Sequence, residues 1–324
     1  MMEYFESIKG NKSQEIPALS AIVVVPDKFE TIKKTLRCLQ QQTVVKQIEI
    51  VIVAPASAQD INKDELETFH SWQVVTIDKV RSISGGFTAG ILQAKAPLVA
   101  LTEDHSFPDI QWAELFIKNH REPWAAVGPS MCNANPDNSV SWADFFQAYG
   151  DWSQPENSGP VRHLPGHNSC YKRDILLSLR EKLPILMQAE SILHRHLTAK
   201  GHQLFLEPAT CTSHQNFNSW SIWIPARFYA GREFAGIWAQ WWPWYRRAAF
   251  TIASPGIPFL RFSRIQRNIK RNRISRSLHW RLLPALITGL ILDCFGQMTG
   301  YALGIGNAAE KMVQYEFHRV KTKR

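Results

Sequence analysis

Cysteine is scarce and widely scattered in this sequence. The 324 residues include five cysteines, and no two of them form a CxxC pair. This spacing supplies neither the ligands of a zinc ribbon nor the framework of a small disulfide-rich domain. We therefore expect reduced thiols at all five positions: Cys38, Cys132, Cys170, Cys211 and Cys294.

The amino terminus lacks the pattern of a secretory signal. Residues 1–17 read MMEYFESIKGNKSQEIP, a polar leader without a basic stretch followed by an apolar one. A signal peptide requires both parts in that order. We expect a cytoplasmic location by default.

The overall composition is that of a chain that packs into one large domain or a domain with an appendage. Hydrophobic residues make up 45% of the sequence and charged residues 20%. The formal net charge of +9 indicates an anionic partner. Nucleotide phosphate, nucleic acid and an anionic membrane surface all fit, because net charge alone does not distinguish among them.

Four short apolar runs alternate with helix-compatible segments in the first third of the chain. They lie at residues 18–26, 48–55, 72–78 and 97–102, and each has the length and β-branched content of a strand. Such runs alternating with helices predict a mostly parallel sheet that is covered on both faces. Ligands bind such a sheet beyond the carboxyl ends of its strands.

A cluster of metal-competent side chains follows the fourth run. Glu103, Asp104 and His105 come directly after PLVALT. If the strand continues, its period of two places Glu103 and His105 on one side and Asp104 on the other, so that the first two can share a cation. The structural alternative is a solvated loop that caps a helix beginning near Asp109.

Several segments, taken in order, resemble family 2 glycosyltransferases of the GT-A fold, of the membrane-associated bacterial type. The opening strand–helix–strand is followed by EDH at the place of a DxD-type metal motif, then by LPGHNSCYKRDIL at the place of a GxN segment. A helix reading LMQAESILHRHLTAKG corresponds to the acidic helix that ends in RLxxxG in that family. The resemblance covers about residues 18 to 214. It implies a mostly parallel GT-A sheet flanked by helices.

The resemblance also implies roles for particular residues. Aligning HLTAKG with RLxxxG places Glu190 at the position of the catalytic base in inverting members. On a helical wheel Glu190 falls within the stripe formed by Leu186, Leu193 and Leu197, so we expect a partly desolvated carboxylate with a raised pKa. The alternative is an inward glutamate that is paired with a nearby basic residue.

The metal site implied by the resemblance joins Glu103 and His105 to a third ligand, His214. Imidazole and carboxylate suit manganese or magnesium, and a diphosphate would fill the remaining positions. Asp104 is a candidate for ribose, or for the metal in place of Glu103. The implied donor is a nucleotide-diphospho-sugar.

The GHNSCYKR loop is a candidate for binding acceptor and donor sugar. Gly166 allows close backbone approach, Asn168 can donate and accept, and Arg173 can contact a phosphate or hold the loop. A plain turn before a helix that begins at Asp174 is the alternative.

The nucleotide-binding motif of the family is altered. Residues 54–56 read APA where the family has an aspartate that holds the base, and Ala89 replaces a usual asparagine. Asp27 and Asp78, each just after an apolar strand, remain as candidate nucleoside contacts.

The composition changes from about residue 231. An aromatic stretch is followed by residues 261–281, which hold eight Arg or Lys and no acid, and then by the apolar segment 282–306. This series is typical of membrane-surface attachment. Asp293 and several glycines argue against a simple crossing. No stacking platform accompanies the basic block, which disfavours nucleic acid as its partner.

Together these features predict a GT-A catalytic domain at 18–230 and a helical membrane-associated region at 231–324, held at the cytoplasmic face of the cell membrane. The expected activity is inverting transfer of a hexosyl group to a saccharide or lipid-linked acceptor, as in polysaccharide biosynthesis. A metal-dependent nucleotidyl or phosphoryl transferase is one rival. The other is a catalytically inactive sugar-nucleotide-binding or lipid-binding membrane protein.

Overall fold

The computed structural model describes residues 7–11, 15–25, 28–58 and 62–316. The chain divides into two compact units. The first consists of residues 1–130 and 155–213, and the second of residues 131–154 and 214–324. The second unit therefore includes a segment from the middle of the chain in addition to the carboxyl-terminal part.

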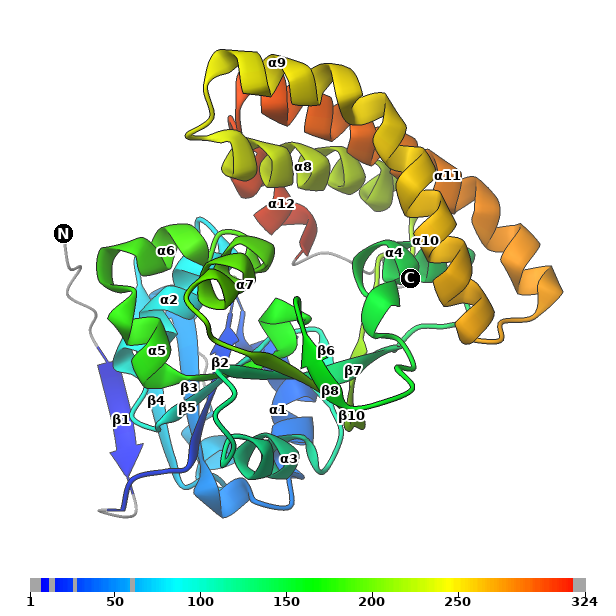
Figure 1. Ribbon diagram of the computed structural model, residues 1–324. Helices are drawn as coiled ribbons and strands as arrows, with labels where there is room; N and C mark the ends of the chain where they lie inside the picture. The colour runs from blue at the N-terminus through cyan, green and yellow to red at the C-terminus, as the bar shows by residue number, and fades with distance from the viewer. Residues whose placement is uncertain (1–6, 12–14, 26–27, 59–61, 317–324) are drawn as a thin grey trace. The chain divides into compact units, whose positions relative to one another are not determined.

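The four apolar runs form the parallel part of a ten-stranded sheet (Figure 1). They are β2 (Leu19–Val24), β3 (Ile48–Pro55), β4 (Ser71–Ile77) and β5 (Leu98–Thr102). β3 pairs in parallel with both β2 and β4, and β5 pairs in parallel with β2. The prediction of these strands is confirmed.

The order of the parallel strands is β4-β3-β2-β5, so the chain changes direction across the sheet after β4. The carboxyl ends of β2 and β5 therefore flank the point at which such sheets bind ligands. Four further strand pairs are antiparallel: β1–β4, β5–β9, β7–β9 and β8–β10. The sheet is thus mixed, with a parallel half that carries the predicted site.

The additional strands lie on both sides of the parallel half. Within the polar leader, β1 (Ser7–Asn11) pairs with β4 and extends the sheet. The strands of the other side are β6 (Ser106–Pro108), β7 (Ala126–Asn133), β8 (Gly159–Val161), β9 (Cys170–Lys172) and β10 (Leu204–His214).

Helices of the first unit connect these strands. The α-helices are α1 (Lys33–Gln40), α2 (Ile83–Gln93), α3 (Trp112–Asn119), α5 (Arg173–Ser178), α6 (Leu183–Leu186) and α7 (Glu190–Ala199). Short 3-10 turns are η1 (Phe29–Ile32), η2 (Val45–Gln47), η3 (Lys63–Leu66), η5 (Gly166–Asn168) and η6 (Arg180–Lys182). Of the helix-compatible segment 60–70, the described part forms only η3.

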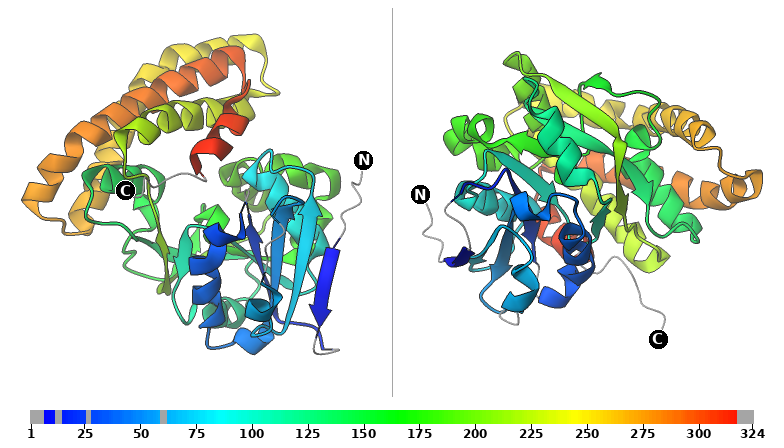
Figure 2. Two further views of the ribbon diagram at one scale, coloured as in Figure 1. Left: turned by 180° about the vertical axis from the view of Figure 1, so that it is seen from behind. Right: turned by 90° about the horizontal axis from the view of Figure 1, so that it is seen from below.

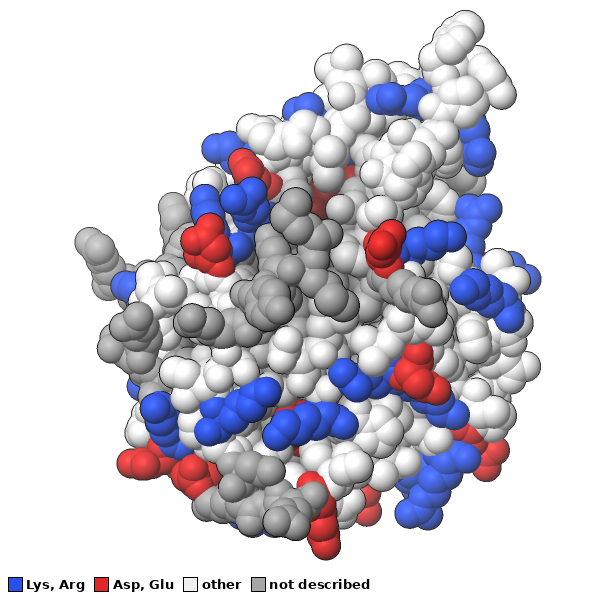
Figure 3. Space-filling model, turned by 90° about the vertical axis from the view of Figure 1, so that its left-hand side faces the viewer, with Lys and Arg blue, Asp and Glu red and all other residues white. Residues whose placement is uncertain are grey.

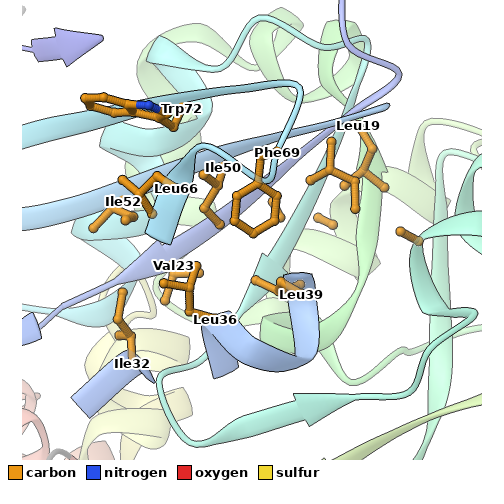
Figure 4. Close-up of a cluster of buried hydrophobic side chains, with 14 of the residues drawn as sticks. Leu19, Val23, Ile32, Leu36, Leu39, Ile50, Ile52, Leu66, Phe69 and Trp72 are labelled. Atoms are coloured by element: carbon orange, nitrogen blue, oxygen red, sulfur yellow. The ribbon is translucent and has the colours of Figure 1, made fainter. Parts of the chain in front are cut away.

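A buried apolar cluster joins one face of the sheet to its helices (Figure 4). Leu36 and Leu39 of α1 pack with strand residues such as Val23 and Ile50. Each buried leucine or isoleucine contributes about 1.5–3 kcal/mol by leaving water. This cluster holds the strands whose ends carry the site.

The second unit is helical in the part that follows β10. Its helices are α4 (Ser139–Ala148), η4 (Gly150–Trp152), α8 (Trp220–Ala239), α9 (Trp244–Ala253), η7 (Ser254–Gly256), α10 (Ile257–Arg271), α11 (Arg276–Leu303) and α12 (Ala308–Glu316). α8 and α9 both pack along α11 (Figures 1 and 2).

α8 and α11 approach each other closely because glycines line their contact. A Cβ added to Gly296 would lie 2.1 Å from the carbonyl oxygen of Phe228, and one added to Gly300 would lie 2.4 Å from that of Arg232. Glycines spaced four apart are a common device for close helix packing. In this protein the device joins two helices of one unit.

Two cysteines correct the expectation of reduced thiols. Cys132 on β7 and Cys211 on β10 are both disulfide-bonded, whereas Cys38, Cys170 and Cys294 are free. β7 and β10 are neighbours in the sheet. Sequence spacing missed this because the positions of strands in the sheet, not distances along the chain, bring cysteines together.

Charges of both signs are interspersed on the face drawn in Figure 3. The net charge of +9 is therefore not one continuous basic surface there. The acid-free block at residues 261–281 remains the strongest local concentration of positive charge along the chain.

Candidate functional site

The turn after β5 carries the predicted metal ligands. The amide of Ser106 donates to the carbonyl of Glu103 at 3.1 Å, so Glu103, Asp104 and His105 form a tight turn instead of continuing the strand. The alternation of sides expected for a continuing strand therefore does not apply. Glu103 and His105 nevertheless meet, because the turn brings Oε1 of Glu103 within 3.9 Å of Nε2 of His105.

A buried hydroxyl on helix α1 hydrogen-bonds to the backbone of this turn. The hydroxyl of Thr35 on α1 lies 2.8 Å from the carbonyl oxygen of Asp104, 3.0 Å from that of Ser106 and 3.3 Å from that of Glu103. Thr35 is fully buried. The backbone of the turn is thus held independently of the side chains that it presents.

Glu103, His105 and His214 together offer three ligand atoms within 4.8 Å of one another. His214 is the last residue of β10. All three residues are buried. One carboxylate and two imidazoles form a donor set that suits manganese or a similar divalent ion.

Each imidazole is oriented by an oxygen on its other nitrogen. Nδ1 of His105 lies 2.5 Å from Oδ1 of Asp104, and Nδ1 of His214 lies 2.9 Å from Oδ1 of Asn216. A second hydrogen bond of this kind fixes the ring and makes Nε2 the ligand nitrogen. Asp104 therefore acts on His105, a contact that the sequence did not predict.

Asn168 in η5 hydrogen-bonds to the carboxylate of Glu103. Its Nδ2 donates to Oε2 of Glu103 at 3.0 Å, and the hydroxyl of Ser106 donates to the same oxygen at 3.3 Å. The Oδ1 atom of Asn168 is buried and has no hydrogen-bond partner. Buried polar atoms without partners are rare and favour sites that take a ligand or water.

Glu190 does not lie within a continuous helix. Helix α6 ends at Leu186, and α7 begins at Glu190, so residues 187–189 separate them. The helical wheel that placed Glu190 in one stripe with Leu186 is therefore wrong. Glu190 is the first residue of α7, where the helix dipole favours a negative charge.

His167 joins the two carboxylates of the site. Its Nε2 lies 2.5 Å from Oε1 of Glu190, and its Nδ1 lies 3.5 Å from Oε1 of Glu103. His167 was not singled out in the sequence, although it stands between Gly166 and Asn168. An imidazole flanked by two carboxylates could not be inferred from a loop residue without knowing which helix faces it.

The electrostatics of this pair correct the expected pKa of Glu190. Burial alone would raise the pKa of the carboxyl, but the charge of His167 and its hydrogen bond outweigh burial and lower the pKa below its usual value. Burial opposes the charge on His167, yet Glu190 and Glu103 together raise its pKa to about 10. The pair is an imidazolium and a carboxylate at neutral pH.

Gly166 allows Glu190 to approach the loop. A Cβ at this position would lie 2.0 Å from Cγ and 2.2 Å from Cβ of Glu190. Non-bonded carbon atoms do not come this close, so any larger residue at position 166 must displace the glutamate. The close approach expected at Gly166 is therefore to a side chain of the protein itself.

A second histidine ties the loop to α7. The amide of Leu164 donates to Nδ1 of His194 at 3.4 Å, which leaves Nε2 to donate to the hydroxyl of Tyr171 at 2.9 Å. The Tyr171 hydroxyl donates in turn to the carbonyl of Gly166 at 3.3 Å. Burial lowers the pKa of His194 to about 4, so the ring is neutral.

The remaining candidates are Arg173, Asp78 and Asp27. The guanidinium of Arg173 donates to the carbonyls of Ile91 and Leu92 at the end of α2, which is the structural alternative for this residue. Asp78 is exposed directly after β4. Asp27 lies outside the described residues.

The chain is similar to a known protein family and to a solved structure. The family model described as glycosyl transferase family 2 matches residues 20–196, which is more than half of the chain. A solved structure of a mannosyltransferase from Pyrobaculum calidifontis, in complex with GDP-Man and Mn2+, is similar at 13% identity. That match covers 94% of this chain and 86% of the other, with a TM-score of 0.48. No curated protein matches.

The mixed sheet flanked by helices is that of the GT-A fold, the fold of sugar-transferring enzymes. The chain belongs to glycosyl transferase family 2. It is therefore a glycosyltransferase.

Proposed function

We propose that the protein is an inverting, metal-dependent glycosyltransferase that uses a nucleotide-diphospho-sugar as donor and an acceptor hydroxyl at a membrane surface. The observation that carries this proposal is the position of His167 between Glu103 and Glu190. One imidazole ring reaches both the turn that holds the metal ligands and the residue at the position of the base. The two parts of the reaction, leaving-group stabilisation and proton removal, therefore have neighbouring residues to perform them.

In the proposed step Glu190 accepts the proton of the acceptor hydroxyl. The oxygen attacks the anomeric carbon from the side opposite the diphosphate, and the nucleoside diphosphate leaves with the electrons of the broken carbon–oxygen bond. A single displacement of this kind inverts the anomeric centre. The lowered pKa keeps Glu190 ionised, and His167 sets the direction of its carboxylate.

The residues present fit a divalent cation. Glu103, His105 and His214 supply one oxygen and two nitrogens, and the buried Oδ1 of Asn168 lies on a side chain that contacts Glu103. A bound Mn2+ or Mg2+ would supply positive charge to the departing diphosphate. The mixed oxygen and nitrogen set favours Mn2+ over Mg2+, because Mg2+ prefers oxygen ligands.

The proposal is tested with purified full-length protein and a panel of nucleotide sugars, with Mn2+, with Mg2+ and with a chelator. Transfer should require metal, and Glu190→Gln should reduce kcat by about 10²- to 10⁴-fold because the base is lost. The anomeric configuration of the product, read by NMR, should be opposite to that of the donor. Retention of configuration would refute the single displacement.

The same measurements separate the rival activities. A nucleotidyl or phosphoryl transferase would cleave at phosphorus and would not respond to Glu190→Gln. An inactive sugar-nucleotide-binding protein would bind a nucleotide sugar without turning it over. A lipid-binding protein with a decayed site would do neither.

We also propose that the acceptor is lipid-linked or a saccharide presented near the cytoplasmic face of the cell membrane. The acid-free basic block supports this side, because basic segments next to membranes stay in the cytoplasm. Disulfides are rare in that compartment, so the disulfide bonding of Cys132 and Cys211 makes thiol labelling in intact cells a direct test. Protection of both thiols from alkylation in intact cells would argue against this location.

A further inference from the structure

Helix α11 exposes large apolar side chains along one side and buries its acidic residue, Asp293, on the other. Trp280, Ile287, Ile291 and Phe295 are exposed by 62%, 46%, 46% and 55%, whereas Asp293 is only 4% exposed. At about 100° per residue, the four exposed residues lie within roughly 80° of one another and Asp293 lies on the opposite side. A surface helix of a water-soluble protein shows the reverse pattern.

The buried side of α11 is held by an ionic network within the helical unit. Oδ1 of Asp293 accepts from Arg227 of α8 at 2.9 Å, and Oδ2 accepts from Arg261 of α10 and from Gln297 at 2.7 Å. Such a network survives only while its partners stay packed, because an unpaired buried charge is costly. α11 is therefore fixed as the central helix of this unit.

Two further helices expose large apolar side chains beside α11. α9 has no buried residue, and its Trp244 and Ile252 are exposed by 80% and 79%. In α10, Phe259 and Leu260 are each exposed by 75%. The side chain of Arg247 ties α9 to the end of α11 by donating to the carbonyl of Tyr301 at 2.7 Å. We call the exposed apolar side chains of α9, α10 and α11 the outer apolar face; its members are Trp244, Ile252, Phe259, Leu260, Ile287, Ile291 and Phe295.

A basic end follows the apolar part of the same helices. The exposed cations of α10, of the turn after it and of the start of α11 are Arg264, Arg267, Lys270, Arg273, Arg276 and Arg281. Trp280 is exposed among them. Tryptophan and basic side chains are enriched where a membrane meets water, because they combine an apolar body with a polar tip.

We propose that the outer apolar face is a membrane-insertion surface, on which the helical unit lies in one leaflet of an anionic bilayer without crossing it. The apolar side chains enter the boundary between headgroups and acyl chains, and the basic end binds the lipid phosphates. This inference rests on the proposed action at a membrane surface and names the residues and the mode of attachment.

Two observations favour attachment over crossing. α11 is the one helix among the described residues that is long and apolar enough to cross, and half of its apolar window is buried inside the unit. If α11 crossed the bilayer, Asp293 would enter the hydrocarbon, either together with Arg227 and Arg261 or without these partners. Charged side chains at the centre of a bilayer are costly.

The test uses flotation of the full-length protein with vesicles of phosphatidylcholine alone or mixed with phosphatidylglycerol. The wild type should float with the anionic vesicles, and high salt should weaken the binding. The variant I252Q/F259Q/L260Q should bind the vesicles at least about ten-fold more weakly, because each substitution removes apolar area from the inserted surface. Ile110→Gln, at an apolar residue of the first unit that is exposed by 58%, is the matched control and should bind as the wild type does.

Charge is tested separately. Replacing Arg267, Lys270 and Arg276 by Gln should abolish the preference for anionic vesicles, whereas replacing Lys118 and Lys200 of the first unit should not. Vesicle-bound protein should be released by alkaline carbonate, which leaves spanning helices in place. Resistance to carbonate would overturn the surface mode in favour of crossing.

Other occupants of the face are outcomes that would overturn the proposal. If the face instead buries a second copy of the chain, light scattering without lipid will give a dimer that the I252Q/F259Q/L260Q variant dissociates. Salt-sensitive binding of RNA without vesicle binding would assign the basic end to nucleic acid. Transfer to a soluble acceptor is measured in parallel, so that a catalytic failure of the proposed function is distinguished from a failure to bind lipid.

Discussion

Nε2 of His167 lies 2.5 Å from Oε1 of Glu190 and thereby orients the carboxylate proposed as the base. The same ring reaches Glu103 through Nδ1 at 3.5 Å. Removing it should disturb the direction of the base more than the folding of the loop. His167→Ala should therefore lower kcat by about ten- to hundred-fold, with a smaller change in the KM of the donor.

The control for this variant is His202→Ala, which changes a histidine in the turn after α7. His167→Gln should recover part of the lost kcat, because an amide can still donate to Glu190. A variant His167→Ala with full kcat would show that Glu190 needs no partner.

Gly166 should not tolerate a side chain. Because an added Cβ would overlap Cγ of Glu190, Gly166→Ala must push the glutamate out of place. A displacement of about 1 Å can cost on the order of a hundred-fold in rate, so transfer should fall by that amount. Gly159→Ala is the matched control, since nothing lies within 4 Å of the added atom. Equal activity of both variants in steady-state assays would contradict this geometry.

Asp104 should act on the metal through His105. Asp104→Asn weakens the hydrogen bond to Nδ1 and loosens the ring, which should reduce Mn2+ affinity by about ten- to hundred-fold. Titration calorimetry measures this directly and does not depend on turnover. Asp78→Asn, at the exposed end of β4, should leave Mn2+ affinity unchanged. A loss of affinity in both variants would point to a general charge effect.

Two buried neutral histidines should make the protein less stable at mildly acidic pH. Burial lowers the pKa of both His120 and His194 to about 4, from an ordinary value near 6.5. Between these values the unfolded chain binds protons that the folded chain does not, so the free energy of unfolding falls as pH falls. Each histidine contributes a slope of up to about 1.4 kcal/mol per pH unit.

Urea unfolding followed at several values from pH 7 to pH 4.5 measures this slope. His120→Gln keeps a donor for the carbonyl of Phe116 but cannot titrate, so its slope should be smaller than that of the wild type by one histidine's share. An unchanged slope would mean that His120 is protonated in the folded state.

Breaking the ionic network of α11 should be strongly destabilising. Asp293→Ala leaves Arg227 and Arg261 buried without their shared carboxylate, at a cost of about 3–5 kcal/mol. Glu30→Gln, which breaks an exposed pair with Lys33, should change stability little, because water screens the pair. Thermal unfolding of the two variants should therefore differ clearly, and similar values would show that the network is dispensable.

Local patterns were enough to predict the parallel half of the sheet. A strand such as residues 48–55 is recognisable by itself, because both its faces are buried and it reads as a continuous apolar run. The position of Glu103 and His105 followed from the strand end alone. The two side chains lie close together although the backbone is not extended, because residues 103–106 form a turn.

Other parts of the site depend on contacts that no local pattern carries. The break between α6 and α7 is not marked by Pro or Gly at residues 187–189, so LMQAESILHRHL reads as one helix. His167 owes its role to Glu190, which lies on another element. For the same reason the sequence predicted a raised pKa for Glu190 from burial, whereas the structure adds an imidazolium that reverses the direction.

The buried hydroxyl of Thr35 has a consequence for variation at this centre. It hydrogen-bonds to the backbone carbonyls of Glu103, Asp104 and Ser106. Helix α1, and not the ligand side chains, therefore holds the backbone of this turn. Ligand side chains can then be exchanged without dismantling their support. Substitutions among Glu103, Asp104 and His105 can therefore change the metal preference while the backbone contacts of Thr35 are kept.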